Sequence, residues 1–227
     1  MQDNSIKVLD HGFVRLVNSM GSDIDIVRAA RVSYDAAWRA GEDAGSDAKL
    51  INYLWNHKHS TPFEAVTFTF EIKAPIFVFR QWHRHRTWSY NELSARYREL
   101  PEEIYMPDFR AQSKSNKQGS DGLMPDQQNT EIQRMFKSQY EQAFCAYRTA
   151  LDAGVAREIA RSVLPVATYS HMFATVNLLN LFKFLQLRND PHAQYEIRQY
   201  AIAIEELIKE VVPVAYQAFV SVRNEGK

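Results

Sequence analysis

Glycine and cysteine are scarce in this chain of 227 residues, which has eight glycines and one cysteine. No two glycines stand as G-x-G, so the sequence has neither a dinucleotide-binding glycine fingerprint nor a P-loop. A bound phosphate must then be held by arginines and helix N-termini. The single cysteine, Cys145, excludes an internal disulfide and a multi-cysteine metal site. It lies in a helical pattern, EQAFCAYRTA, and we expect it to be a small core residue.

Net charge and long apolar runs are also absent. Lys plus Arg and Asp plus Glu each number 27, so the chain is a poor general binder of nucleic acid or of anionic membranes. No window of about 18 apolar residues and no signal-peptide pattern occurs. No G-x-S-x-G elbow supports a serine nucleophile. We therefore expect a cytoplasmic protein with no membrane or nucleic-acid partner, and a single domain over residues 1–227.

Hydrophobic periodicity predicts an α+β fold with strands concentrated early and helices late. The clearest strand is AVTFTFEIKA, residues 65–74, in which Val66, Phe68 and Phe70 alternate with polar residues. The next segment, PIFVFRQWHRH, predicts a helix with Pro75 in its first turn.

Further helices are expected from apolar residues spaced three and four apart. One begins at Ser22 or Asp23, and another begins with Ser46 as its N-cap. The second half of the chain is mostly helical. In LLNLFKFLQL, residues 178–187, apolar residues surround the helix, so we expect it to be buried on most sides. The polar stretch at about 101–130 predicts a mobile surface loop.

Arginines and aromatic residues are concentrated in RHRTWSYNELSARYR, residues 84–98. Arg80 and Arg84 are four residues apart, as are Gln81 and His85, so a helix that continues from Pro75 stacks these pairs at its C-terminal end.

The second part of this stretch favours an extended chain, because Glu92, Ser94 and Arg96 alternate with other residues. A carboxylate, a hydroxyl and a guanidinium then lie on one side. Guanidinium binds phosphate in a bidentate geometry, and a carboxylate accepts hydrogen bonds from sugar hydroxyls or base edges. The pattern indicates a nucleotide site.

Three other interpretations of the stretch stay open at this point. It can be a solvated basic face neutralised by Glu92 and Glu99. A binder of single-stranded nucleic acid could hold phosphates with the arginines and stack bases on Trp82, Trp88 and Tyr90. A nucleotide hydrolase normally needs a metal-binding carboxylate cluster, and the sequence has none beside the arginines.

The chain contains the motif R-H-R followed, after seven further residues, by S. This motif resembles the signature of the flavin-dependent thymidylate synthases, the ThyX family. Here it consists of Arg84, His85, Arg86 and Ser94. ARVSY, HSTPFE, AREIAR and LRNDPHAQYEI resemble other blocks of that family in the same order. Together the blocks cover about residues 29–205 and leave the segment around 113–128 unmatched.

The resemblance implies a ThyX-type α+β fold, with an antiparallel or mixed sheet and a helical C-terminal half, assembled as a homotetramer with active sites shared between subunits. It implies reductive methylation of dUMP to dTMP with FAD, with 5,10-methylenetetrahydrofolate as carbon donor and NADPH as reductant. This route needs no covalent cysteine nucleophile, which suits a chain whose one cysteine lies in an apolar helical pattern. The flavin then carries the redox chemistry.

The resemblance also implies roles for individual residues. Arg188, in LRND, matches the family arginine that contacts the uracil ring and favours its ionised form, which makes C5 a better nucleophile. The residues expected to bind dUMP are Gln81, Arg84, Glu92, Leu93, Ser94, Ala95, Arg96, Arg161 and Arg188, with Gln81 supplied by a neighbouring subunit. The residues expected to bind FAD are Ser33, Thr61, Glu64, Arg84, His85, Arg86, Asn91, Glu92, Asn177, Lys183 and His192. His59 is expected at the flavin face where folate or NADPH stacks.

Some of these residues have a simpler structural interpretation. Arg188 can compensate the dipole at a helix C-terminus. Arg157, Glu158 and Arg161 can form a surface ion-pair ladder.

Histidines raise the question of a metal. His57 and His59 form an H-x-H pair that Glu64 could extend, but no further cluster completes a ligand shell and the family uses none, so we expect no metal. His192 and Glu196, four residues apart, are expected to form a supporting pair.

Two positions depart from the family pattern. Leu179 stands where relatives often have a polar or basic residue, which removes a possible FAD contact. Lys183 stands where an asparagine is common and places a cation near the flavin ring, where it can stabilise a reduced, anionic flavin.

Overall fold

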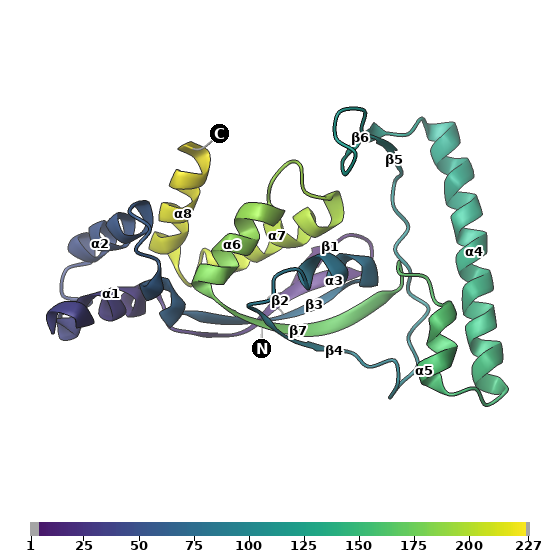
Figure 1. The fold of residues 1–227 in the computed structure, drawn as a ribbon, viewed down its shortest axis with the longest axis horizontal. Helices are drawn as coiled ribbons and strands as arrows, with labels where there is room; N and C mark the ends of the chain where they lie inside the picture. The colour runs from purple at the N-terminus through teal and green to yellow at the C-terminus, as the bar shows by residue number, and fades with distance from the viewer. Residues whose placement is uncertain (1–4, 226–227) are drawn as a thin grey trace.

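The computed structural model describes residues 5–225 and contains a five-stranded antiparallel sheet (Figure 1). In spatial order the strands are β1 (Ser5–Val8), β2 (Gly12–Met20), β3 (Thr67–Pro75), β7 (Tyr169–Asn177) and β4 (Ser89–Glu92). The predicted α+β class is confirmed. β7 lies between β3 and β4 although its residues follow those of β3 by about 100 positions and those of β4 by about 80, so the centre of the sheet joins distant parts of the chain.

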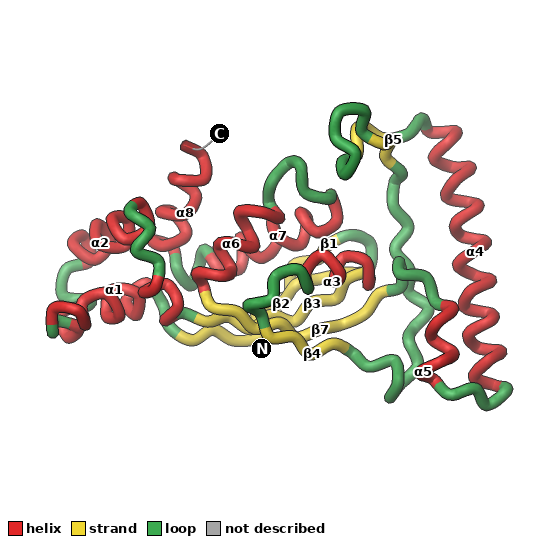
Figure 2. Tube along the Cα trace, in the orientation of Figure 1, coloured by secondary structure: helices red, strands yellow, loops and turns green. Residues whose placement is uncertain are grey.

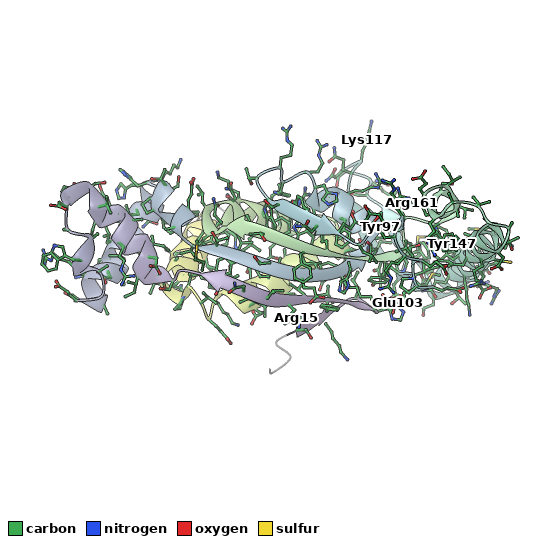
Figure 3. The ribbon with its side chains drawn as sticks, turned by 90° about the horizontal axis from the view of Figure 1, so that it is seen from below. Arg15, Tyr97, Glu103, Lys117, Tyr147 and Arg161 are labelled. Atoms are coloured by element: carbon green, nitrogen blue, oxygen red, sulfur yellow. The ribbon has the colours of Figure 1, made fainter. Side chains whose placement is uncertain are left out.

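Helices cover one face of the sheet and both of its ends. α3 (Ile76–Trp82), α6 (Leu178–Arg188) and α7 (Tyr195–Ile208) lie over the face (Figure 1). α1 (Asp23–Arg31), α2 (Ala44–Asn56) and α8 (Pro213–Glu225) gather at one end, and α4 (Asp126–Asp152) and α5 (Arg157–Ala160) at the other. Seen from below in Figure 3, the strands lie in front of the covering helices. Among the described residues, no helix is long and apolar enough to cross a bilayer.

Short helical turns connect these elements. They are η1 (Val32–Tyr34), η2 (Ala37–Arg39), η3 (Thr61–Ala65) and η4 (Arg161–Val163). Turn η3 packs against both α1 and α6.

The main hydrophobic core lies between the sheet and α6 and α7. Val66, Phe68 and Phe70 are completely buried, as their alternation predicted. α6 is also buried on most sides, because Leu178, Phe182 and four other apolar residues are buried and the helix contacts β7, η3 and α7; Leu187, near its end, is exposed. The core therefore fixes the direction of α6 and the position of Arg188 at its last residue.

Gly12 marks a close approach between β2 and α7. A Cβ added at Gly12 would lie 2.1 Å from the Tyr200 hydroxyl and 2.7 Å from the Lys73 carbonyl oxygen. The Tyr200 hydroxyl donates a hydrogen bond to that carbonyl at 2.8 Å. Only glycine leaves room for this contact.

The two predicted helix starts have different outcomes. α1 begins after Ser22, as predicted. α2 begins earlier than predicted, because the Asp43 side chain, not Ser46, accepts hydrogen bonds from the first backbone amides.

The predicted helical stacking of Arg84 and His85 is wrong. α3 ends at Trp82, and the Tyr90 hydroxyl donates to the carbonyl oxygens of Trp82 and His85, at 3.0 and 2.8 Å. This side chain satisfies carbonyls that a continuing helix would have used.

The extended segment predicted through Glu92, Ser94 and Arg96 is also too long. β4 ends at Glu92, and Ser94 lies in a turn whose carbonyl accepts from the Tyr97 amide at 3.0 Å. Glu92, Ser94 and Arg96 therefore do not share one strand face.

The stretch 101–130 is not a simple loop. It contains a hairpin of β5 (Arg110–Gln112) and β6 (Ser120–Leu123), shown in Figure 2, and the first residues of α4. Hydrogen bonds from the Gln112 side chain to two carbonyls stabilise the hairpin, at 3.1 and 3.0 Å. The polar composition concealed these strands because it carries no alternation of apolar residues.

The prediction that Cys145 is a core residue is wrong, since its side chain is exposed on α4. α4 packs mainly on α5 and η4 and buries only Phe144 and Tyr147. A helix with one narrow contact face leaves most of its apolar residues incompletely buried.

Candidate functional site

Arg188 is the centre of one group of predicted site residues. Its Nε donates to Nε2 of His85 at 3.0 Å, and its two terminal nitrogens donate to the side-chain and backbone oxygens of Gln81 at 3.0 and 3.2 Å. α6 supplies Arg188, α3 supplies Gln81, and the turn after α3 supplies His85 and Arg84. We call Gln81, Arg84, His85 and Arg188 the Arg188 group.

The charges in this group influence one another. Burial, and then the positive charge of Arg188, lower the pKa of His85 to about 4. Burial, and then the positive charge of Arg84, lower the pKa of Arg188. The His85 ring is therefore neutral near pH 7 and accepts at Nε2, and the two guanidinium groups provide positive charge for an anion.

A second group of predicted residues lies between the end of β4 and α5. Arg96 forms an ion pair with Glu158 at 3.1 Å, and Arg161 donates to the Glu158 backbone carbonyl at 3.4 Å. Figure 3 shows Tyr97, the neighbour of Arg96 in sequence, and Arg161 at the α5 end of the molecule. We call Glu92, Ser94, Arg96 and Arg161 the Arg96 group.

The backbone around the Arg96 group is held by the edge of the sheet. Ser170 donates to the Glu92 carboxylate at 2.8 Å, and the Leu93 amide donates to the His171 carbonyl at 2.7 Å. Ala95 is buried. Oγ of Ser94 accepts from the Arg96 amide at 3.3 Å, which fixes a turn.

The predicted dUMP residues therefore fall into two groups within one chain. Gln81 belongs with Arg188 and not with Arg96, Arg161 and Ser94, because its side chain contacts Arg188 directly. The alternative ion-pair ladder among Arg157, Glu158 and Arg161 does not form: Arg96 takes the Glu158 carboxylate, and Arg157 lies 3.8 Å from Glu99.

The predicted flavin residues are spread over several elements, and Asn177 lies at the opposite end of α6 from Arg188. Ser33 follows α1, Thr61 and Glu64 lie in η3, Asn177 caps α6, and Lys183 lies on α6. The oxygen of the Asn177 side chain accepts from the Asn180 amide at 3.0 Å. Asn91 lies in β4, and His192 is exposed in the loop before α7.

The cations near these elements fit a phosphate-containing ligand. Arg84, Arg86 and Lys183 are exposed and make no ion pair with any described residue. Leu179 is buried in the core instead of facing a ligand. Unpaired guanidinium groups suit a diphosphate such as that of a flavin dinucleotide.

His57 and His59 lie at the end of α2 beside Tyr53. The His57 ring stacks on Tyr53 with centroids 4.1 Å apart, and the His59 ring lies 6.0 Å from the same ring. Over residues 5–225, no group of three or more His, Cys, Asp or Glu is arranged to hold a metal ion. The exposed rings offer a stacking surface for a planar ligand.

The predicted pairing of His192 with Glu196 is wrong. His192 contacts Asp190, with Nδ1 and Oδ1 2.9 Å apart, because both lie in the loop before α7. Glu196 is buried in the first turn of α7 and forms an ion pair with Arg110 of β5. Arg110 was outside the predicted site because it belongs to none of the sequence blocks that carry the resemblance, and only the structure brings it to Glu196.

Comparison with known proteins gives the family. A family model described as "Thymidylate synthase complementing protein" matches residues 15–214. A flavin-dependent thymidylate synthase of Thermus thermophilus is 52% identical over 216 residues, which cover 95% of this chain and 78% of that protein. The chain belongs to the flavin-dependent thymidylate synthase family. As a member, it is a methyltransferase that makes thymidylate with the help of a flavin.

Other relatives match over nearly their whole length. The flavin-dependent thymidylate synthase of Thermosipho africanus is 45% identical over 97% of this chain and 96% of its own. The UMP/dUMP methylase PolB from Streptomyces cacaoi, solved with 5-Br dUMP, has a TM-score of 0.85 and 41% identity, and the match covers 95% of this chain and 97% of PolB. A second PolB structure, with 5-Br UMP, has a TM-score of 0.84.

Proposed function

We propose that this chain reductively methylates dUMP to dTMP with FAD as its flavin, 5,10-methylenetetrahydrofolate as carbon donor and NADPH as reductant. The observation that carries the proposal is the position of Arg188. It is held by His85 on one side and Gln81 on the other, beside the charge of Arg84. A half-buried cation held in this way suits an anionic ring whose charge develops during reaction.

Arg188 has the central role in the proposed chemistry. Its guanidinium stabilises negative charge on the uracil ring, and this charge increases the nucleophilicity of C5 toward the methylene carbon. Because C5 itself attacks, no enzyme thiolate is required. This fits a chain whose only cysteine lies on α4, which packs on α5 and η4.

The phosphate of dUMP is assigned to Arg84 of the Arg188 group and to Arg96 and Arg161. Arg96 exchanges its exposed contact with Glu158 for phosphate at small cost, because an exposed ion pair contributes little. Glu92 is assigned to the sugar, and Leu93 and Ala95 contribute backbone groups at the end of β4.

FAD is assigned to the elements around α6. Arg84 and Arg86 would hold the diphosphate, and Lys183 would lie near the flavin ring; the remaining contacts are assigned to Ser33, Thr61, Glu64, His85, Asn91, Glu92, Asn177 and His192. When bound, the flavin supplies the reducing equivalents that convert the transferred methylene group to methyl. The exposed ring of His59 is assigned to the stacking surface for folate or NADPH.

The division into an Arg188 group and an Arg96 group supports a homotetramer with shared sites. Each active site then takes the Arg188 group from one subunit and the Arg96 group from another. We also propose that residues 1–227 form one cytoplasmic domain that acts on small molecules rather than on nucleic acid.

An anaerobic assay tests the proposal. The protein is loaded with FAD, reduced with NADPH and mixed with dUMP and methylenetetrahydrofolate, and dTMP and flavin reoxidation are followed together. We expect both to appear, with dependence on both substrates. UMP is the matched control substrate, because PolB was solved with analogues of both nucleotides. Protein that binds no flavin but binds single-stranded nucleic acid, with an affinity that falls steeply as salt rises, would contradict the proposal.

A further inference from the structure

A chain of side-chain hydrogen bonds connects Arg188 to a buried carboxylate outside the proposed ligand contacts. The Gln81 side chain, which accepts from Arg188, donates from its nitrogen to the Gln194 side-chain oxygen. The Gln194 nitrogen donates to Oε2 of Glu196 at 2.9 Å. The chain therefore runs from Glu196 through two amides to the proposed catalytic guanidinium.

Glu196 is itself firmly held. It is 2% exposed and lies in the first turn of α7, where the helix dipole favours a carboxylate. Its Oε1 accepts from the Tyr105 hydroxyl at 3.2 Å and from Arg110 of β5. Arg110 also lies over the Tyr195 ring, 4.6 Å from its centroid. Both carboxylate oxygens are therefore used.

The residues at the two ends of this series of hydrogen bonds, Glu196 and Arg188, determine how both glutamine amides are oriented. Ionised Glu196 only accepts hydrogen bonds and Arg188 only donates them. The Gln194 nitrogen must then face Glu196, so its oxygen faces Gln81. Gln81 in turn presents its nitrogen to Gln194 and its oxygen to Arg188. If either amide rotated by half a turn, two donors or two acceptors would face each other, which costs the lost hydrogen bond.

We propose that Glu196, acting through Gln194, is a positioning residue that orients the Gln81 amide and thereby holds Arg188 in its substrate-binding direction. The inference rests on the proposed function, which assigns dUMP to Arg188. Glu196 touches neither substrate nor flavin in this proposal. It acts by fixing which end of each amide faces the next residue.

The substitution Glu196→Gln tests the donor-to-acceptor direction of these hydrogen bonds with little change in side-chain shape. The oxygen of the new amide would accept from Arg110 and Tyr105, so its nitrogen would face Gln194. Both glutamines would then turn, and Gln81 would present a donor to Arg188. We expect kcat/KM for dUMP to fall about ten- to a hundredfold and the dUMP dissociation constant from calorimetry to rise, with flavin absorbance unchanged.

The exchange Gln194→Glu with Glu196→Gln is the matched control. A carboxylate at position 194 accepts from Gln81 and from the new amide at 196, and the amide oxygen there still accepts from Arg110 and Tyr105. Each hydrogen bond between position 196 and Arg188 then has a donor facing an acceptor again, although the carboxylate has moved away from Arg110. We expect the double variant to recover most of the lost dUMP binding and turnover.

The outcomes separate this role from a purely structural one. A wild-type kcat/KM for E196Q would overturn the inference. A double variant with a kcat/KM as low as that of E196Q would also overturn it, because the loss would then come from the broken ion pair with Arg110. If E196Q does not fold, Gln194→Met provides the test, because it breaks the chain of hydrogen bonds and leaves Glu196 paired with Arg110 and Tyr105. A lowered kcat/KM for this variant supports the inference, and a wild-type value overturns it.

The same measurements separate the inference from the proposed function. Wild-type protein that neither binds nor methylates dUMP, or Arg188→Ala protein with normal activity, would overturn the assignment of Arg188 and the inference with it. Active wild-type protein with inactive Arg188→Ala, combined with unaffected Gln194→Met, would overturn the inference alone.

Discussion

Nε of Arg188 donates a hydrogen bond to Nε2 of His85 at 3.0 Å. This contact requires a neutral imidazole, because protonated histidine has donors on both nitrogens. Burial and the Arg188 charge lower the His85 pKa from 6.5 to about 4. Between these values the unfolded chain binds a proton that the folded protein does not, so His85 makes stability rise with pH across this window and fall as the pH falls.

We therefore expect urea unfolding to show a loss of stability as the pH is lowered from 6.5 to about 4, and a smaller loss in His85→Gln. The glutamine is a neutral acceptor that does not titrate, so the difference between the two proteins isolates His85. Parallel profiles for the two proteins would contradict the assigned neutral state.

Replacing Arg188 by Ala should lower kcat/KM for dUMP by about a hundredfold or more, since the electrostatic stabilisation of the ring is lost. The oligomer and the flavin spectrum should not change, because Arg188 is half-buried at the end of α6 and contributes little to the core. Size-exclusion chromatography and a visible spectrum provide the controls. Arg188→Lys should stay weak, because lysine cannot contact His85 and Gln81 together in the same fork.

Ser94→Ala should retain substantial turnover. Oγ of Ser94 accepts from the Arg96 amide, which is a turn contact and does not activate a nucleophile. Steady-state kinetics with dUMP measures the effect, and we expect a loss of less than about tenfold for one hydrogen bond. Complete inactivity of a folded variant would show that Ser94 takes part in the chemistry.

Mixing two inactive variants should restore activity if sites are shared between subunits. Arg188→Ala and Arg96→Ala each damage a different group of the proposed site. After co-refolding of equal amounts, about a quarter of the sites should receive both intact groups, because each group is intact in half of the subunits. Each variant refolded alone is the control. Activity that stays at the level of the single variants would indicate sites formed within one chain.

Gly12→Ala should destabilise the protein, because the added Cβ would meet the Tyr200 hydroxyl at 2.1 Å and two backbone carbonyl oxygens below 3 Å. Overpacking of this kind costs about 1–3 kcal/mol. Thermal unfolding measures it, with Gly122→Ala as the matched control, since a Cβ there meets nothing within 4 Å. Equal Tm values for the two variants would contradict the close approach of β2 and α7.

The elements that could be predicted from the sequence are those in which apolar residues recur at the regular spacing of a strand or a helix. The alternation in β3 and the apolar surface of α6 specify burial locally, and both are confirmed. β7 was missed because its buried face includes Ser170 and Ala174, whose small side chains give no apolar alternation. Its place in the sheet depends on pairing with β3 and β4, which no local pattern records.

The candidate site shows the same limit. The Arg84, His85 and Arg86 motif led to the family because its chemistry is local. The contact between Gln81 and Arg188 joins residues 107 positions apart, and the ion pair of Glu196 with Arg110 joins a family block to an unmatched hairpin. Polar contacts of this kind depend on the tertiary fold, so residue type and spacing alone did not reveal them.

The position of β7 also bears on how the enzyme forms during synthesis. Among the described strands, β4 pairs only with β7, so Glu92 and Leu93 have no sheet partner until residues 169–177 have left the ribosome. α6, which ends at Arg188, follows β7 directly. Both halves of the nucleotide site therefore depend on one late, long-range pairing, a high-contact-order step that comes after most of the chain is made.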